Sequence, residues 1–526
     1  MNSRLVPPSQ VSGFGDAAVA PHHLSALAAL EIMARGGNAV DGALAANAVQ
    51  GVVAPETCGV GGDLFAIVHE PGQAAPVVLN ASGRAGRGVN AETLRANGFA
   101  SIPYSHPDAV TVPGCVDGWS VLAERFGRLP LAQSLKPAIG YARHGFAVSD
   151  ELASALGQLR ERLDLRSPAG GLYPGGVPPA PGDVVERRDL AATLEIISAG
   201  GSRAFYQGEV GRAISRATQA RITMEDLAEV RSDWVEPLTL EVLGLTGWTV
   251  PPNSQGYLTL ATAWLFERLD PPDDPDHPEF FHLLIEAYRA AAWDLGDVVA
   301  DPDYAPLSQN DLLDPLRLSE RLAGISRKSA AAWPTAAAPP GGTAYLCVVD
   351  RDGMGVSLIQ SNYTGFGGGI GVEGAGFFLH NRGAGFNLSP GHPNELAPGK
   401  RPLHTLSPTL WTRDGRLELL LGTRGGSYQP QLLVQVAAHL LRRRSSPAES
   451  QARPRWVIDR HPEQVRLEAS AGDKVAQELA SRGHRIQPAG EFERGWGPVS
   501  MIQIGRSGLR TAASDPRAPT ALAAVR

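Results

Sequence analysis

Two glycines followed directly by a threonine and a buried strand are the most constraining feature of this sequence. The stretch is Gly341-Gly342-Thr343, and an apolar run, 345–349, continues it. That run predicts a buried strand, because it is rich in apolar and β-branched residues. A turn at Asp352-Gly353 then predicts a returning strand over 356–361. Thr343 therefore stands where a loop enters a core strand.

A threonine in this position is suited to cutting its own amide bond. Its hydroxyl can attack the carbonyl of Gly342, because glycine tolerates strained backbone and offers no side-chain obstruction. Cleavage would leave Thr343 with a free α-amino group beside its hydroxyl. A threonine with its own amine as base is an activated nucleophile. The alternative is that Thr343 is only a β-forming residue at the start of a strand.

Composition excludes several classes of protein. The 526 residues carry a net charge of −7, which argues against a nucleic-acid groove and against a patch that binds a membrane surface. No run of about 18 apolar residues predicts a membrane span. Residues 1–16 lack the apolar core of a signal peptide, so we expect a cytoplasmic protein.

Cofactor and metal motifs are also missing from the sequence. The three cysteines, Cys58, Cys115 and Cys347, are odd in number and far apart, so they predict neither a disulfide framework nor a Cys-x-x-Cys metal site. The glycine-rich turn 58–63 lies between a predicted helix and a predicted strand, the reverse of the order in nucleotide-binding motifs. It therefore indicates close backbone packing. We expect no cofactor and no metal.

Two further glycine-rich loops could carry polar chemistry. Arg84 and Arg87 lie in the loop 80–87, where they could receive a carboxylate or simply face solvent. Gly425 and Gly426 lie between a predicted strand and a predicted helix, where adjacent backbone N–H groups can form an oxyanion hole.

Periodicity gives a coarse outline of the remaining chain. Helical spacing predicts helices over 17–33 and 41–53, and alternation predicts paired strands over 238–250. The Pro- and Ala-rich stretch 330–340 predicts an exposed linker before the threonine.

Motifs in order along nearly the whole chain resemble the γ-glutamyltransferase family. They are Gly36-Gly37-Asn38-Ala39-Val40-Asp41, Gly59-Val60-Gly61-Gly62, Val112-Pro113-Gly114, Phe126-Gly127-Arg128-Leu129-Pro130, Phe205-Tyr206-Gln207-Gly208, Lys400-Arg401-Pro402-Leu403, Gly425-Gly426-Ser427, Arg482-Gly483-His484 and Ser514-Asp515-Pro516-Arg517.

The resemblance implies an α+β fold, the αββα sandwich of the N-terminal-nucleophile hydrolases, built from both halves of the chain. It implies cleavage before Thr343 into a large segment, 1–342, and a small segment, 343–526, which stay associated as a heterodimer. Thr343 matches the family's nucleophile, and Ser361 matches the hydroxyl residue that hydrogen-bonds it. Gly425 and Gly426 match the oxyanion hole. Whether the heterodimers associate further is left open.

The sequence departs from the family at the positions that hold a γ-glutamyl group. Ala344-Tyr345 replaces the Thr-His after the nucleophile, Tyr363 replaces an asparagine although Asn362 is adjacent, and His404-Thr405 replaces a serine pair. The acidic pair expected in 382–386 is missing. The arginine that grips the α-carboxylate falls on Ala91, with only Arg84 and Arg87 nearby.

These departures predict an amidohydrolase or acyltransferase that acts on an acylated small molecule. A desolvated ammonium without an acceptor is unfavourable by about 1–3 kcal/mol, which disfavours glutathione as a substrate. The pattern is more similar to the transferase-like branch and to cephalosporin acylases. We expect Arg84, Arg87, Asn362, Tyr363, His404 and Thr405 to contact the substrate.

Two alternatives remain open on the sequence. The first keeps true γ-glutamyl specificity, with Arg84 or Arg87 holding the carboxylate and Asn362 holding the amine. The second is an uncleaved, non-catalytic relative that serves as a binding or scaffold protein.

Overall fold

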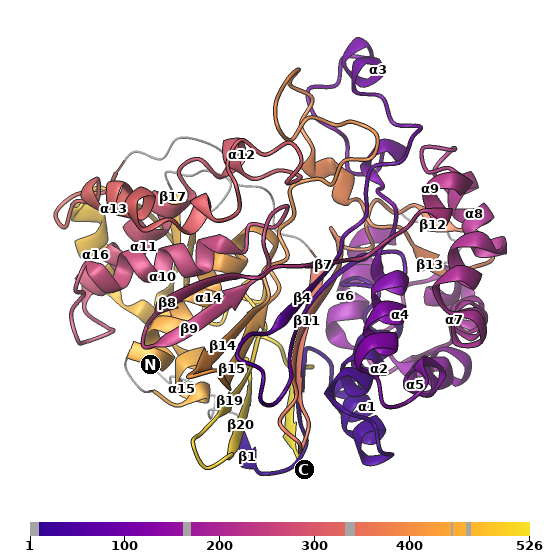
Figure 1. Ribbon diagram of the computed structural model, residues 1–526, viewed down its shortest axis with the longest axis horizontal. Helices are drawn as coiled ribbons and strands as arrows, with labels where there is room; N and C mark the ends of the chain where they lie inside the picture. Colours follow the sequence, from indigo (N-terminus) through magenta and orange to yellow (C-terminus); the bar gives the residue numbers. More distant parts are fainter. Residues whose placement is uncertain (1–9, 161–169, 332–341, 443–444, 459–463) are drawn as a thin grey trace.

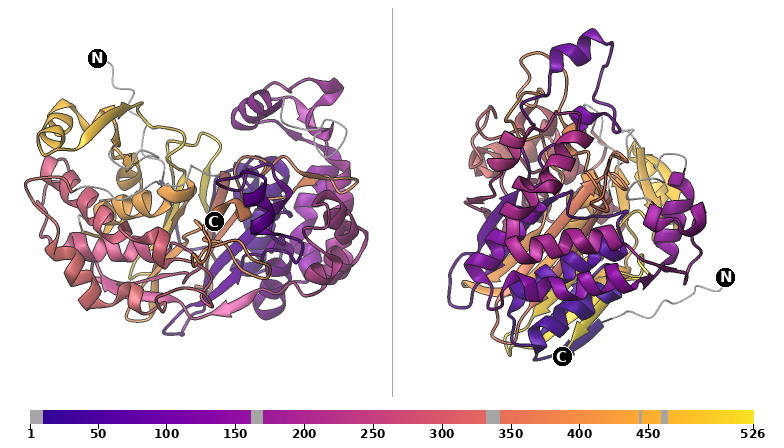
Figure 2. Two further views of the ribbon diagram at one scale, coloured as in Figure 1. Left: turned by 90° about the horizontal axis from the view of Figure 1, so that it is seen from above. Right: turned by 90° about the vertical axis from the view of Figure 1, so that its right-hand side faces the viewer.

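Two seven-stranded sheets lie face to face between two layers of helices (Figure 1). The view from above shows the same four layers (Figure 2). The computed structural model describes residues 10–160, 170–331, 342–442, 445–458 and 464–526. The αββα sandwich predicted from the resemblance is thereby confirmed, whereas most of the expected linker, 332–340, lies outside the described residues.

One sheet contains the predicted nucleophile near its middle. Its order is β21 (Leu522–Val525), β2 (Ala17–Ala20), β10 (Gly342–Val349), β11 (Gly355–Tyr363), β3 (Asp63–His69), β4 (Val77–Ala81) and β7 (Asp233–Val235). The facing sheet has the order β1 (Gln10–Gly13), β20 (Arg510–Ser514), β19 (Val499–Ile504), β15 (Arg416–Thr423), β14 (Thr409–Arg413), β9 (Leu245–Thr249) and β8 (Leu238–Val242).

Helices cover the outer face of each sheet (Figure 1). The layer on the β10 sheet contains α1 (His23–Ala34), α2 (Ala39–Val53), α4 (Cys115–Phe126), α5 (Leu131–His144), α6 (Asp150–Leu159), α7 (Arg188–Gln207), α8 (Glu209–Ala217) and α9 (Met224–Ala228). The layer on the β15 sheet contains α10 (Tyr257–Arg268), α11 (Pro278–Ala292), α13 (Pro315–Ala323), α14 (Gln429–Ala437) and α16 (Asp473–Ser481). The short helices α3 (Ala91–Ala96), α12 (Leu295–Val298) and α15 (Pro447–Ala452) complete the described set.

Small strands lie outside the two main sheets. They are β5 (Phe146–Ala147) with β6 (Val184–Val185), β12 (Gly371–Val372) with β13 (Phe377–Phe378), and the three-stranded sheet of β16 (Trp456–Ile458), β17 (Gln464–Glu468) and β18 (Arg485–Ala489). None of the described helices is both long enough and apolar enough to span a membrane.

The predicted hairpin after Thr343 is confirmed as β10 and β11, which pair antiparallel. Both strands are buried along nearly their whole length, since one face packs on helices and the other on the second sheet. This two-sided burial explains the continuous apolar run 345–349, which a strand with one solvent face would not need. The paired strands predicted over 238–250 are confirmed as β8 and β9.

Both segments on either side of Gly342-Thr343 contribute strands to each sheet. In the β10 sheet, β2, β3, β4 and β7 precede this bond, whereas β10, β11 and β21 follow or span it. The facing sheet mixes β1, β8 and β9 with later strands in the same way. The two segments therefore share one core.

The expected helix over 17–33 is wrong in its first part. Ala17–Ala20 forms the buried strand β2, which pairs with β10 and β21, and α1 begins only at His23. His22 is the N-cap of α1, and its side chain accepts a hydrogen bond from the Leu24 amide. Four small apolar residues fit either periodicity, and pairing within the sheet decides between them.

Candidate active site

Thr343 and Ser361 are brought together at one end of the β10–β11 hairpin. They are register partners, and Thr343 Oγ1 lies 3.0 Å from Ser361 Oγ. Ser361 Oγ also donates to the Gly342 carbonyl at 2.6 Å and accepts from the Tyr363 amide at 2.8 Å. A serine hydroxyl has one proton, so Thr343 must be the donor to Ser361. The proton of Thr343 thus points at Ser361, which in turn hydrogen-bonds the carbonyl of the predicted scissile bond.

A side chain at position 342 is excluded by close packing. A Cβ there would lie 2.7 Å from the carbonyl oxygen of Glu56, in the loop between α2 and β3, and 3.3 Å from the Gly365 amide. Gly342 has no positive φ, so the expected backbone strain is not what requires glycine. The reason is the close approach of another segment.

Thr343 and Ser361 face the second sheet. Tyr345 and Cys347, on the same side of β10, belong to the core between the sheets. On the second sheet, a Cβ at Gly422 of β15 would lie 2.1 Å from the Tyr345 ring, whereas Leu417 packs at the far end of the hairpin. Strand β15 thus runs towards Thr343, and the loop that follows it reaches the same end.

That loop carries the predicted oxyanion glycines. Gly425 has φ +125° and Gly426 has φ +58°, conformations that favour glycine. Gln255 Nε2 donates to the Gly426 carbonyl at 3.1 Å and so fixes the loop. Within the described part of the chain, no acceptor takes the N–H of either glycine. Two such amides near a nucleophile can bind a developing oxyanion, and this role stays a prediction.

Sequence reasoning missed Asp63, which lies beside Ser361 on the side away from Thr343. Asp63 is the register partner of Ser361 on β3 and is fully buried. Its Oδ1 accepts from the Gly83 amide at 3.0 Å, and its Oδ2 lies 3.1 Å from His404 Nε2. Burial alone would raise the pKa of Asp63, but the neighbouring His380 and His404 hold it below its ordinary value. Thr343, Ser361 and the charged carboxylate of Asp63 therefore lie side by side on three neighbouring strands.

The sequence does contain a signal next to Asp63. The preceding glycine turn was expected to mark close backbone packing, and this is confirmed, since a Cβ at Gly62 would lie 2.3 Å from the Ser361 carbonyl oxygen. An acidic residue after such a turn could have been noted, but its partners come from far along the chain.

Three of the predicted substrate residues gather around Arg382. Arg382 Nη1 donates to Thr405 Oγ1 at 3.1 Å, and its Cζ lies 3.6 Å from the centroid of the Tyr363 ring. His404, next in sequence to Thr405, binds Asp63. Burial lowers the pKa of His404 to about 4, so this imidazole is neutral at pH 7. The sequence had shown only that carboxylates are missing at 382–386.

The structure does not bring the Asn362 side chain to Thr343. Successive residues of a strand point to opposite faces, so Asn362 faces the helix layer. It lines a small cavity with Cys58, Gly59 and Arg187, and its Oδ1 has no partner within the described residues. A role for Asn362 in holding a substrate amine is therefore not supported.

Arg84 and Arg87 are already paired with carboxylates. Arg84 Nη1 lies 3.1 Å from Asp301, and Arg87 binds Asp226 and Glu229, each at 2.7 Å. Both arginines line a surface cavity of about 480 Å³ to which Thr343 does not contribute. The structure thus leaves neither arginine free to hold a carboxylate beside Thr343.

Glu56 is a second residue that the sequence did not single out. Its carbonyl packs against Gly342, and its Oε2 has no partner in the described residues. Burial, reinforced by the carboxylate of Glu151, raises the pKa of Glu56 to about 8. Glu151 on α6 pairs with Arg424, the residue before Gly425 and Gly426. Helix α6 is thereby tied to the loop that holds these glycines.

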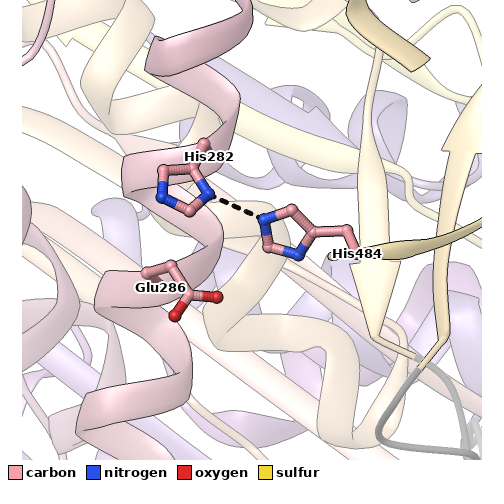
Figure 3. A group of neighbouring side chains, drawn as sticks. All are labelled: His282, Glu286 and His484. Atoms are coloured by element: carbon pink, nitrogen blue, oxygen red, sulfur yellow. Dashed lines mark hydrogen bonds between the residues drawn. The ribbon is translucent and has the colours of Figure 1, made fainter. Parts of the chain in front are cut away.

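A separate buried cluster contains His282, Glu286 and His484 (Figure 3). His282 Nδ1 lies 2.8 Å from His484 Nε2, and His282 Nε2 lies 2.8 Å from the Ser326 carbonyl. Glu286 accepts from the Ala331 amide at 2.8 Å and from Arg289 at 3.0 Å. Both nitrogens of His282 and both oxygens of Glu286 are thus engaged. The cluster joins the segment 326–331 to α11 and does not present a set of open metal ligands.

This cluster should make stability dependent on pH. Burial lowers the pKa of His484 to about 3 and also lowers the pKa of His282, whereas an unfolded histidine titrates near 6.5. The contribution of His484 is therefore complete above about pH 6.5 and is lost as pH falls below it, by about 1.4 kcal/mol per pH unit, and His282 acts in the same direction. Denaturant unfolding at pH 7.5 and at pH 5 measures this loss.

The matched variants are His484→Gln and His144→Gln, since His144 is exposed at the end of α5. We expect His484→Gln to lose less stability than the wild type between pH 7.5 and pH 5, and we expect His144→Gln to lose as much as the wild type. Identical pH profiles for the two variants would contradict a role of the cluster.

Comparison with known proteins places the chain in a family. The family model described as gamma-glutamyltranspeptidase matches residues 25–525. The chain belongs to this family. It is 34% identical over 518 residues to the glutathione hydrolase-like YwrD proenzyme of Bacillus subtilis, covering 96% of this chain and 98% of the relative.

Relatives with other activities match equally well along the chain. The oxamate amidohydrolase proenzyme of Klebsiella pneumoniae is 34% identical over 532 residues, which covers 98% of this chain and 99% of the relative. The crystal structure of a cephalosporin acylase from Bacillus halodurans superposes with a TM-score of 0.92 at 32% identity, covering 100% of this chain and 98% of that one. The similarity to the acylase branch expected from the sequence is confirmed.

Proposed function

We propose that this γ-glutamyltranspeptidase-family protein is a self-processing amidohydrolase or acyltransferase with Thr343 as its N-terminal nucleophile. The observation that carries the proposal is the hydrogen-bonded chain from Thr343 Oγ1 through Ser361 Oγ to the Gly342 carbonyl. This chain aligns a hydroxyl, a proton acceptor and the bond to be cut. Relatives named as proenzymes support a processed mature form.

Self-cleavage follows from this arrangement. Thr343 Oγ attacks the carbonyl carbon of Gly342, while Ser361 accepts the Thr343 proton and passes its own proton to the Gly342 carbonyl oxygen, which gives a neutral tetrahedral intermediate. Collapse of this intermediate breaks the C–N bond, and the Thr343 nitrogen takes up the proton. Water then hydrolyses the ester between Gly342 and Thr343. Residues 1–342 and 343–526 result, and their shared core keeps them associated as a heterodimer.

Turnover repeats the same chemistry on a small molecule. The freed α-amino group of Thr343 takes the proton of its own hydroxyl, and Thr343 Oγ attacks the substrate amide. Gly425 and Gly426 donate their N–H groups to the oxyanion, and the amine leaves with the proton. Water or an acceptor amine then releases the acyl group. The residues of this chain supply every proton transfer.

Release of p-nitroaniline from a series of acyl anilides tests the proposal. The processed protein should hydrolyse at least one acyl anilide, and the rate should follow the amount of processed chain. A protein that is processed but cleaves no acyl anilide, or one that is never processed, would remove the support for this function.

The alternative with true γ-glutamyl specificity is less well supported. It needs Arg84, Arg87 and Asn362 beside Thr343, whereas both arginines are paired elsewhere and Asn362 faces the helix layer. A non-catalytic relative is disfavoured by the intact alignment of Thr343 and Ser361.

A further inference from the structure

Arg382 is a buried cation next to the proposed active site. It begins the short 3₁₀ segment Arg382–Gly385 and is only 1% exposed. Thr405 Oγ1 accepts from its Nη1, and the ring of Tyr363 lies under its guanidinium. Its Nε has no hydrogen-bond partner among the described residues, and no described carboxylate forms an ion pair with it. A guanidinium stays charged at every relevant pH, so its burial without an anion is unfavourable.

Two acidic side chains of neighbouring segments, Asp63 and Asp108, are engaged with other groups. The Asp63 carboxylate accepts from the Gly83 amide and from His404 Nε2. The backbone of Asp108 packs against Gly383, but its carboxylate pairs with Arg221 at 3.2 Å and with His106 at 2.8 Å.

Arg382 lies beside the place that an acyl group occupies during catalysis. Tyr363, on which Arg382 stacks, is the register partner of Gly342. In self-cleavage the Gly342 carbonyl is itself the acyl carbonyl, so a substrate acyl group attached to Thr343 takes the same position. Ser361 and Tyr363 are two residues apart on the strand, a rise of about 7 Å. A short acyl chain spans such a distance.

Resting on the proposed function, we propose that Arg382 binds a carboxylate at the far end of the acyl group. The substrate class is then the monoamides of short dicarboxylic acids, such as glutaryl amides. Hydrolysis adds one water and yields the dicarboxylate and a free amine. The planar guanidinium matches a carboxylate in shape, while Thr405 and Tyr363 fix its orientation. An α-ammonium on the acyl chain would meet Arg382 without any carboxylate to receive it, so γ-glutamyl amides should be poorer substrates.

Three p-nitroanilides test the assignment with the processed wild-type protein: the glutaryl compound, its methyl ester and the γ-glutamyl compound. We expect kcat/KM for the glutaryl anilide to exceed that for the ester by about 10- to 100-fold, the effect of a charge-assisted hydrogen-bonded pair. In Arg382→Gln this ratio should fall to near one through a higher KM for the glutaryl compound. Arg382→Lys should keep part of the ratio.

The matched control is Arg87→Gln, which removes an equal charge at a half-exposed ion pair and should leave the ratio as in wild type. Inhibition by glutarate needs no variant, so it applies even if Arg382→Gln fails to fold: glutarate should inhibit the wild type at least tenfold more strongly than its monomethyl ester. An unchanged ratio in Arg382→Gln, or equal inhibition by the two acids, would overturn the assignment. Failure of the proposed function is recognised separately, because either self-cleavage before Thr343 or the hydrolysis of every acyl anilide, the ester included, would then be missing.

Discussion

The Thr343→Ala variant should remain a single uncut chain and should release no p-nitroaniline from any acyl anilide. Alanine removes the hydroxyl that lies 3.0 Å from Ser361, and no other described hydroxyl contacts both Ser361 and the Gly342 bond. Loss of a nucleophile lowers hydrolytic rates by about 10⁴-fold or more. Denaturing electrophoresis and the anilide assay measure the two effects.

Thr343→Ser is the matched control, because it keeps both the hydroxyl and, after cleavage, the α-amino group. It should be cut and should retain part of the activity. A Thr343→Ala protein that is still cut before residue 343, or that still turns over anilides, would exclude Thr343 as the nucleophile.

The Ser361→Ala variant should process itself about 10²- to 10³-fold more slowly, the usual effect of removing one donor to a developing oxyanion. Alanine removes both the proton acceptor for Thr343 and the 2.6 Å hydrogen bond to the Gly342 carbonyl. The half-life of the full-length band after purification measures the rate.

Ser361→Thr retains the hydroxyl at the same strand position and should process at nearly the wild-type rate. The fold should be intact in both variants, which unfolding in denaturant checks. Equal processing by Ser361→Ala and wild type would show that Ser361 is a packing residue and not part of the reaction.

The hairpin and the sandwich could be predicted because their signals are local or extend over the whole chain. Residues 345–349 form a continuous apolar run next to a turn, and this pattern alone predicts a buried, paired strand. The sandwich followed from many ordered motifs. The strand Ala17–Ala20 could not be predicted, because its small residues lack a distinctive period and its partners β10 and β21 lie hundreds of residues away.

The site was predictable only where the interacting side chains come from one local segment of the chain. Thr343 and Ser361 stand on adjacent strands of one hairpin, so their pairing follows from the local register. Arg382 and Asp63 gain meaning only from partners that the fold brings from distant segments. Arg84 and Arg87 were expected to contact the substrate, but the structure pairs them with carboxylates. The composition of their loop could not reveal these partners, which are Asp301, Asp226 and Glu229.

The most direct measurement is the mass of the fragments after the purified protein is incubated, mixed with an acyl anilide that it hydrolyses and quenched in acid. The account predicts two chains, 1–342 and 343–526, with a population of the second heavier by one acyl group on the peptide that begins with Thr343. A single chain of 526 residues, or an acyl group on any other residue, would contradict the assignment of Thr343 as the nucleophile.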